Sequence, residues 1–450
     1  MSERFGLYSQ RVLTEDGLSP ATITIVGNKI EDIIPEKVER FDYPIEDLGN
    51  LVLMPGLIDS HVHINEPGRT EWEGFDTATR SAAAGGITTL VDMPLNSIPV
   101  TTTAQAFEDK LNSSKGKLQV NCGFWGGVVP DNCHDLQPLI EAGVLGFKAF
   151  LIDSGIDEFD FVGEKHLRQA LPVIAKNKLP LLAHAEIFSD HEGIALFNKD
   201  LTSYKAYLMS RPRKWEDDAI QMLISLCREF DCKTHIVHLS SANLLPLIME
   251  VKTQGFPLTT ETCPHYLYFN AEDIPDASTI YKCAPPIRER VNNELLWKAL
   301  KNGIIDFVVT DHSPSTPDLK QAESGDLAKA WGGIAGLQFS LPVFWTKARA
   351  NDFTIEEVGA LMSTRVAEFL NLDHQLGKIK KGYQADLMVW DPERSFEVTE
   401  SMIQHRHKIT PYLGERLMGK VERTYVGGKL VYKGGKFVDL GQGRILLRDQ

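Results

Sequence analysis

The sequence lacks several features that would assign it to a specialised class of protein. Its 450 residues include only six cysteines, which are scattered and form no Cys-x-x-Cys pair, so a disulfide framework is not expected. Positive charge is in the minority, and a formal net charge of −14 disfavours a nucleic-acid partner, because phosphate binding needs a basic face. Long hydrophobic runs are missing too, so neither a signal peptide nor a membrane span is expected. These absences predict a cytoplasmic globular protein without a nucleic-acid or membrane partner.

What the chain does contain, between about residues 56 and 370, is a regular alternation of apolar runs with amphipathic stretches such as "KHLRQALPVIAKNK". Seven runs read as strands, and residues 279–286 are a doubtful eighth; the seven are 57–63, 85–94, 118–129, 143–151, 179–186, 233–241 and 304–311. Strand-helix alternation of this length predicts a parallel sheet, and eight such units close into a barrel. The predicted fold class is therefore α/β, with a TIM-type (β/α)8 barrel.

Both ends of the chain have the composition of short β-structure. Residues 20–53 contain paired apolar runs around a Gly-Asn turn, and residues 376–437 contain similar runs around a Gly-Gly turn. Neither end is large enough to bury one face of a sheet by itself. We therefore expect residues 1–55 and 371–450 to form one composite β-sandwich domain, with the barrel of residues 56–370 inserted between them.

Polar side chains follow the apolar runs at the ends of the predicted strands, where barrel enzymes place their catalytic groups. In "LIDSHVHINEPG", His61 and His63 lie two residues apart, so a strand points both in the same direction. Converging imidazoles suit a metal ion, although two ordinary core histidines are the alternative. The other strand-end residues are Lys148, His184, His238 and Asp311. Burying a polar group without a partner costs free energy, so six such groups at matching strand ends predict one shared site.

Several other histidines must be separated from this set. His235 and His238 are three residues apart, so only one can face the barrel centre, and we favour His238 because it is nearer the strand end. His312 directly follows Asp311 and should point away from it, while His265 lies beside a proline, either behind the site or in a loop. The remaining histidines are interpreted as surface or ordinary core residues: His134, His166, His191, His374, His405 and His407.

Lys148 is the unusual member of the set, because a lysine beside four imidazoles does not suit a cation site. A buried lysine tends to lose its charge, and a neutral amine can react with carbon dioxide to form a carbamate. The carbamate is an anionic ligand with two oxygen atoms, able to bridge two metal ions. The alternative is a lysine that reaches solvent at the strand end. Composition alone does not decide between them.

These motifs resemble the cyclic amidohydrolases of the amidohydrolase superfamily, a group that includes dihydroorotases, hydantoinases or dihydropyrimidinases, and allantoinases. The resemblance covers nearly the whole chain, and "HINEPGRTEWEGFDTATRSAAAGGITTLVDMPLNS" and "KAWGGIAGLQ" look most like allantoinases. It implies that His61, His63 and Asp311 bind a buried metal ion, that His184 and His238 bind a more exposed one, and that a carboxylated Lys148 bridges the two. It also suggests a homotetramer.

The implied reaction is hydrolysis of a ring amide. Two cations about 3.5–4 Å apart would share a bridging hydroxide, which attacks the ring carbonyl polarised by the exposed metal. Asp311 would act as general base and then as general acid towards the departing nitrogen. Mixed imidazole and oxygen ligands favour zinc, although iron, cobalt or manganese would fit. The resemblance thus implies opening of the hydantoin ring of allantoin to allantoate, in purine catabolism.

Two differences from related enzyme groups indicate which ring the protein opens. Asn65 stands where dihydroorotase-like chains carry an arginine that grips a carboxylate, and residues 148–159 lack the tyrosine typical of hydantoinase-like chains. Both departures favour a neutral ring such as allantoin, with another cyclic amide as the alternative. Because all six ligand positions are retained, a non-catalytic scaffold is disfavoured.

Substrate contacts are expected from loops after the first two strands. We predict that Asn96 and Arg69 contact the substrate, with a turn asparagine and a surface arginine as the alternatives. Ala284 and Asp153 differ from the residues expected in many relatives and leave the substrate contacts open.

Overall fold

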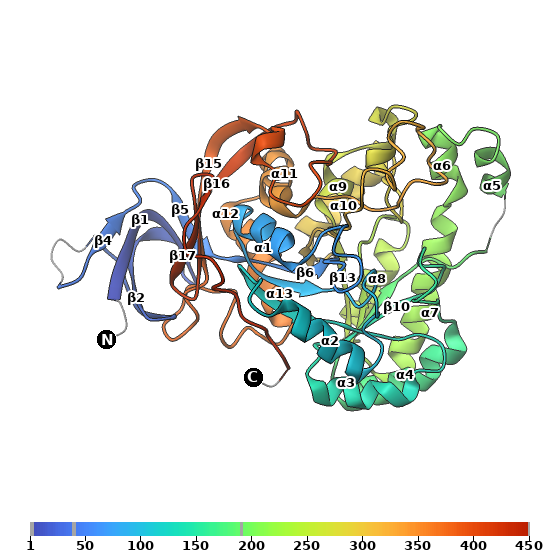
Figure 1. Ribbon diagram of the computed structural model, residues 1–450, viewed down its shortest axis with the longest axis horizontal. Coiled ribbons are helices and arrows are strands. Elements are labelled where there is room, and N and C mark those ends of the chain that lie inside the picture. The colour runs from blue at the N-terminus through green and yellow to red at the C-terminus, as the bar shows by residue number, and fades with distance from the viewer. Residues whose placement is uncertain (1–3, 38–41, 190–191, 449–450) are drawn as a thin grey trace.

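The molecule is built from two sheet systems, one made by both ends of the chain and one by its middle (Figure 1). The computed structural model describes residues 4–37, 42–189 and 192–448, so His191 lies outside the described residues. In Figure 1 the sheet of the chain ends lies at the left, and the barrel with its helices lies at the right.

The sheet of the chain ends has nine strands, and its order is β18-β17-β16-β15-β5-β1-β2-β3, with β4 paired to β1. The strands are β1 (Arg4–Thr14), β2 (Gly17–Val26), β3 (Lys29–Ile34), β4 (Ile45–Asp47), β5 (Val52–Pro55), β15 (Leu387–Glu397), β16 (Arg416–Val426), β17 (Lys429–Lys433) and β18 (Lys436–Phe437). The two ends meet at β5, which pairs in parallel with β1 and antiparallel with β15. A buried apolar cluster that includes Ile23, Leu53 and Val389 supports this junction.

The predicted Gly-Gly turn joins β16 to β17, where Val426 pairs with Lys429. Gly427 and Gly428 have φ values of 53° and 74°, a left-handed conformation that side chains with a Cβ rarely adopt. The β-rich unit formed by both chain ends is confirmed, and its boundaries at residues 55 and 371 stay a prediction.

Eight parallel strands form the barrel, with β9 (Gly126–Gly127) continuing the third of them. They are β6 (Leu57–Val62), β7 (Ile87–Asp92), β8 (Asn121–Phe124), β10 (Phe147–Phe150), β11 (Leu181–His184), β12 (Thr234–Ile236), β13 (Leu258–Thr262) and β14 (Phe307–Val308). Val62 pairs in parallel with His312 just beyond β14, which closes the ring. The predicted α/β barrel class is therefore confirmed.

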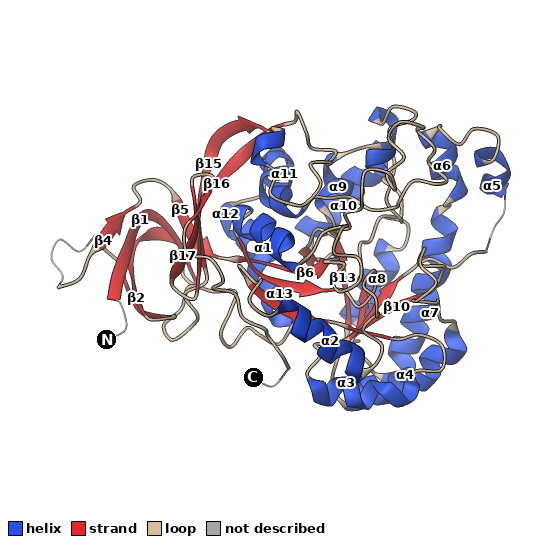
Figure 2. Ribbon diagram, in the orientation of Figure 1, coloured by secondary structure: helices blue, strands red, loops and turns tan. Residues whose placement is uncertain are grey.

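Helices cover the outside of the barrel strands (Figure 2). Their bounds are α1 (Phe75–Ala84), α2 (Ala104–Ser114), α3 (Leu136–Ala142), α4 (Glu164–Lys176), α5 (Glu192–Phe197), α6 (Tyr204–Ser210), α7 (Arg213–Phe230), α8 (Leu245–Thr253), α9 (Pro264–Tyr268), α10 (Arg290–Lys301), α11 (Ser340–Ala348), α12 (Ile355–Gly359) and α13 (Arg365–Phe369). The longest, α7, buries Trp215, Leu223 and Cys227 at helical spacing. None of the helices in the described ranges is both long and apolar enough to cross a membrane.

One predicted strand is wrong. Residues 279–286 form a short 3-10 turn over Thr279–Tyr281 and then irregular chain, and the remaining barrel strand is β13, in "PLTTETC". This strand has no apolar run that would mark it in the sequence, because threonines and Glu261 occupy its buried positions. Its β-branched residues were the available signal.

Candidate active site

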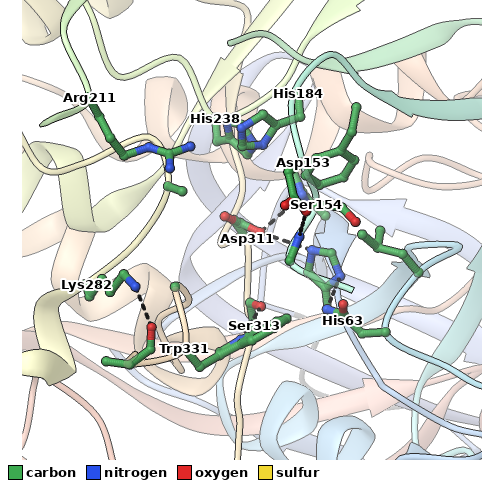
Figure 3. A pocket seen from close by; sticks show the side chains of 18 of the residues that line it. His63, Asp153, Ser154, His184, Arg211, His238, Lys282, Asp311, Ser313 and Trp331 are labelled. Carbon is green, nitrogen blue, oxygen red and sulfur yellow. Dashed lines mark hydrogen bonds and ion pairs between the residues drawn. The ribbon is translucent and has the colours of Figure 1, made fainter. Parts of the chain in front are cut away.

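The six predicted strand-end side chains line one pocket of about 290 Å³ at the carboxyl ends of the barrel strands (Figure 3). All six residues are buried: His61, His63, Lys148, His184, His238 and Asp311. The Nε2 atoms of His61 and His63 lie 3.2 and 3.3 Å from Asp311 Oδ1. Candidate ligand atoms of His61, His238 and Asp311 all lie within 4.8 Å of one another, which makes this a possible metal site.

Lys148 is completely buried in β10, and its Nζ has no hydrogen-bond partner among the described residues. Burial lowers the pKa of Lys148 to about 8, because a low-dielectric surrounding disfavours the charged amine. The nearby Asp311 and Glu261 act in the opposite direction. A neutral amine is therefore accessible at this position near neutral pH.

His61 is held by a group outside the predicted set. Its Nδ1 lies 2.5 Å from Oε1 of Glu261, whose side chain is fully buried. A carboxylate there accepts the Nδ1–H, which leaves Nε2 of His61 free to bind a metal.

Asn96 lines the pocket, and its Nδ2 lies 3.2 Å from His63 Nδ1, while its Oδ1 has no partner among the described residues. Rotating the amide by 180° would let Oδ1 accept the Nδ1–H of His63 and free its Nε2. Asn96 therefore has a role towards His63 besides any contact with substrate.

His184 and His238 form the other half of the cluster, and their ring centroids are 4.6 Å apart. His184 Nε2 lies 2.7 Å from Glu186 Oε2, so Nδ1 is the nitrogen that remains for a metal. His238 Nδ1 is buried without a partner among the described residues. Both rings can therefore present one nitrogen to a shared ligand.

Four residues beside the pocket adopt left-handed backbone conformations that are uncommon for residues other than glycine. They are Asn65, Asn96, His238 and Asp311, with φ values of 66°, 67°, 39° and 48°. Such conformations persist only where the surrounding structure enforces them, and they concentrate at functional sites. The chain turns sharply at these positions, and the turns place His238 and Asp311 at the pocket.

Some predicted residues lie elsewhere. Arg69 is absent from the pocket lining; it forms an ion pair with Glu158 at 3.0 Å and lies over the Trp72 ring. The prediction that Arg69 contacts substrate gains no support from this position, because its charge is already paired in the loop. Asp153 and Ala284 both line the pocket.

Three of the histidines that the sequence separates from the ligand set are buried and do not line the pocket: His235, His312 and His405. His312 is fully buried, and its Nδ1 accepts the backbone N–H of Gly336 at 3.2 Å. His235 does not line the pocket, but its Nε2 lies 2.9 Å from Glu261 Oε2, so it is linked to His61 through one carboxyl group. His405, interpreted from the sequence as a surface or an ordinary core residue, is buried.

Three side chains that contact the candidate ligands or line the pocket were not predicted from the sequence: Glu186, Glu261 and Arg211. Glu186 lies two residues after His184, so strand spacing could have indicated that both face the same way. Glu261 follows no apolar run, and Arg211 lies in a loop, so no local pattern marks either of them.

A parallel α/β barrel with a histidine and carboxylate cluster at its carboxyl edge defines the class of metal-dependent barrel hydrolases. The chain belongs to the amidohydrolase family, whose profile matches residues 52–431. It is 47% identical to an allantoinase of Streptomyces avermitilis over 98% of both chains. It is 44% identical to an allantoinase of Arabidopsis thaliana, over 99% of this chain and 91% of the other.

Among solved structures, an L-hydantoinase (dihydropyrimidinase) from Arthrobacter aurescens matches with a TM-score of 0.93 at 30% identity, covering 100% of both chains. The resemblance to cyclic amidohydrolases read from the sequence is thereby confirmed.

Proposed function

We propose that the protein is a hydrolase of cyclic amides that opens the hydantoin ring of allantoin to give allantoate. The observation that carries this proposal is the intact set of six strand-end side chains in one pocket, in a chain that matches allantoinases over nearly its whole length. Hydantoinase, dihydropyrimidinase or dihydroorotase activity is the second candidate, favoured by the likeness to the L-hydantoinase structure.

The charges in the pocket lining support a neutral ring. Asn65 does not line the pocket and so places no cation there; its amide donates to the Pro314 carbonyl oxygen at 3.3 Å. Apart from Lys148, the lysines and the arginine of the lining are already engaged: Arg211 with Glu186, Lys282 with the carbonyl oxygen of Ala330, and Lys329 with Asp326. A substrate carboxylate, such as that of dihydroorotate, would have to compete with these partners.

The donor set suits two divalent cations, with zinc favoured over iron, cobalt or manganese. His61, His63 and Asp311 would hold one cation, His184 and His238 the other, and a carbamate formed from Lys148 and carbon dioxide would lie between them. The buried, partnerless Nζ of Lys148 and Nδ1 of His238 support this fit, because such orphans among the described residues are otherwise costly. When bound, the cations supply Lewis acidity towards water and the ring carbonyl.

The chain's own residues perform the proton transfers and the positioning. Asp311 is proposed to take the proton from the attacking water and to deliver it to the departing ring nitrogen, as general base and then as general acid. The position of its side chain in the pocket, beside His61 and His63, supports this role.

A substrate panel tests the proposal. Protein loaded with zinc and bicarbonate should hydrolyse allantoin with a higher kcat/KM than hydantoin, dihydrouracil or dihydroorotate, because the chain is 47% and 44% identical to allantoinases. The charges of the lining disfavour only dihydroorotate, which carries a carboxylate. The assay measures allantoate formation and, for the other rings, the loss of ultraviolet absorbance. A clear preference for hydantoin, dihydrouracil or dihydroorotate over allantoin would overturn the assignment.

The resemblance also leads us to propose a cytoplasmic homotetramer, and a domain division at residues 1–55 and 371–450 against 56–370. Sedimentation equilibrium gives the mass of the assembly, and a monomeric mass at micromolar concentration would exclude the tetramer. Limited proteolysis at the boundaries tests the domain division.

A further inference from the structure

Two ion pairs with buried carboxylates lie behind His184 and His238. Arg211 donates to Glu186 from Nε and Nη2 at 3.1 and 2.6 Å, and Arg288 donates to Oε1 of Glu216 at 3.0 and 2.5 Å. The Glu186 side chain is 0% exposed, and those of Glu216 and Arg288 are each 2% exposed. Such pairs are costly to break, because the remaining charge would be buried without a partner.

The first pair determines how His184 presents its ring. Glu186 Oε2 accepts from Arg211 Nη2 and also lies 2.7 Å from His184 Nε2. A carboxylate held in this way keeps the proton of His184 on Nε2 and leaves the lone pair of Nδ1 available. Figure 3 shows Arg211 extending towards the side of the pocket that carries His184 and His238.

The second pair holds the backbone that carries His238. Glu216 Oε2 accepts the N–H groups of Ser240 and Ser241 at 3.2 and 2.9 Å, directly beyond the strained turn at His238. A left-handed histidine persists only where its surroundings enforce it. The Glu216 carboxylate supplies two of the contacts that do so.

The two pairs are connected to each other. Arg288 Nη2 donates to the backbone carbonyl oxygen of Arg211 at 3.3 Å, and Glu216 lies in the first turn of α7, just after Arg211. His61 and His63 instead contact Glu261 and Asn96. Glu261 is the group common to both halves, because its Oε1 also accepts the backbone N–H of His238 at 3.3 Å.

We propose that Arg211, Glu186, Glu216 and Arg288 are positioning residues that set the affinity of the His184–His238 half of the site for its divalent cation, separately from the His61–His63 half. The inference rests on the proposed function, since it takes the centre to hold two cations.

The test measures zinc stoichiometry and affinity in Glu186→Gln and Arg211→Lys. Glu186→Gln keeps the shape but removes the charge, and Arg211→Lys keeps the charge but removes the two-pronged contact. Each variant should retain one tightly bound zinc per chain and bind the second about 10–100-fold more weakly than the wild type. In Glu186→Gln, whose altered residue does not line the pocket, added zinc should restore kcat with little change in KM.

The matched control is Arg168→Lys. Arg168 also pairs with two glutamates, Glu164 and Glu229, but on the exposed surface of α4 and α7 and without a contact to the pocket. It should bind both zinc ions as the wild type does. Glu261→Gln serves as a positive comparison, and it should weaken both zinc ions.

Two outcomes would overturn the inference: wild-type affinity for both zinc ions in Glu186→Gln and Arg211→Lys, or equal weakening of both ions. If Glu186→Gln fails to fold by circular dichroism, Arg211→Lys decides the question. Failure of the proposed function is seen separately, in a wild-type protein that binds fewer than two cations or does not hydrolyse allantoin.

Discussion

Lys148 is the one cation among the six strand-end side chains of the pocket, and an ammonium group between two metal ions would be repelled by both. We expect Lys148→Ala to abolish hydrolysis and the binding of two metal ions, because no other ligand supplies a bridging anion. Short carboxylic acids such as propionate should partly restore both by occupying the vacated space. Activity and metal content with and without the acid are the measurements, and reconstitution of metal-stripped wild type should depend on bicarbonate.

Two results would contradict the carbamate on Lys148. One is full activity of Lys148→Ala, and the other is an unmodified lysine mass in active holoenzyme. The mass must be recorded without acid, because a protonated carbamate decomposes and would be missed.

Substitutions of His238 and His235 should distinguish a metal ligand from a residue that only supports the fold. We expect His238→Ala to lose the cation of the His184–His238 half together with activity, whereas His235→Ala should keep both metal ions and lose stability. The His235 ring stacks on Phe307 and packs against Phe369, so its removal leaves a cavity that costs on the order of 2–4 kcal/mol. Chemical denaturation and metal analysis distinguish the two effects. Loss of metal from His235→Ala alone would mean that the proposed ligand assignment is wrong.

At the scale of loops and strands, Lys320 joins two segments that line the pocket. Its ammonium group is buried and donates to the carbonyl oxygens of Thr279, Lys282, Trp331 and Gly333 at 3.4, 3.3, 3.0 and 2.5 Å. We expect Lys320→Met, which has a similar shape, to leave these carbonyls unpaired and to loosen both segments. Steady-state kinetics should show KM rising several-fold, with a smaller change in kcat. An unchanged KM in a folded variant would assign Lys320 to stability alone.

The sequence could predict those elements whose strand pattern is apolar and whose end carries a polar residue. Strands such as β10 and β11 meet both conditions, and so Lys148 and His184 could be placed at one edge of the barrel. Strand β13 could not be found in the same way, because Glu261 and the threonines beside it are buried through hydrogen bonds. The supporting residues depend on contacts between distant segments, and local periodicity carries no information on those.

At the scale of the whole molecule, the buried His405 makes the free energy of unfolding depend on pH in the acidic range. Burial lowers the pKa of His405 from 6.5 to about 3, so the folded protein resists a proton that the unfolded chain accepts below pH 6.5. The contribution of His405 to the free energy of unfolding should therefore fall as the pH decreases from about 6.5 towards 3, by at most about 1.4 kcal/mol for each pH unit. Other buried histidines, such as His235, add to the total slope, so His405→Phe should reduce the slope in denaturation curves without abolishing it. Replacing the exposed His374 with glutamine is the control and should leave the slope unchanged.

The union of the two chain ends could be predicted from their size, since neither end can bury a sheet face alone. The order of the nine strands could not, because β5 and β15 are adjacent in the sheet yet are separated by the entire barrel in the sequence. Nothing in the composition near Leu53 indicates that its partner is Val389.

The position of β5 between β1 and β15 affects how the protein is made on the ribosome. The nascent chain exposes one edge of β5 from the time Pro55 is synthesised until Leu387 emerges, and throughout that interval the edge has backbone groups without their final partner. The barrel can begin to form during this time, but the sheet of the chain ends cannot be completed. Translation pauses within the barrel would therefore prolong the period in which this edge can pair with another nascent chain, and a chaperone that covers extended strands would act on the first fifty-odd residues.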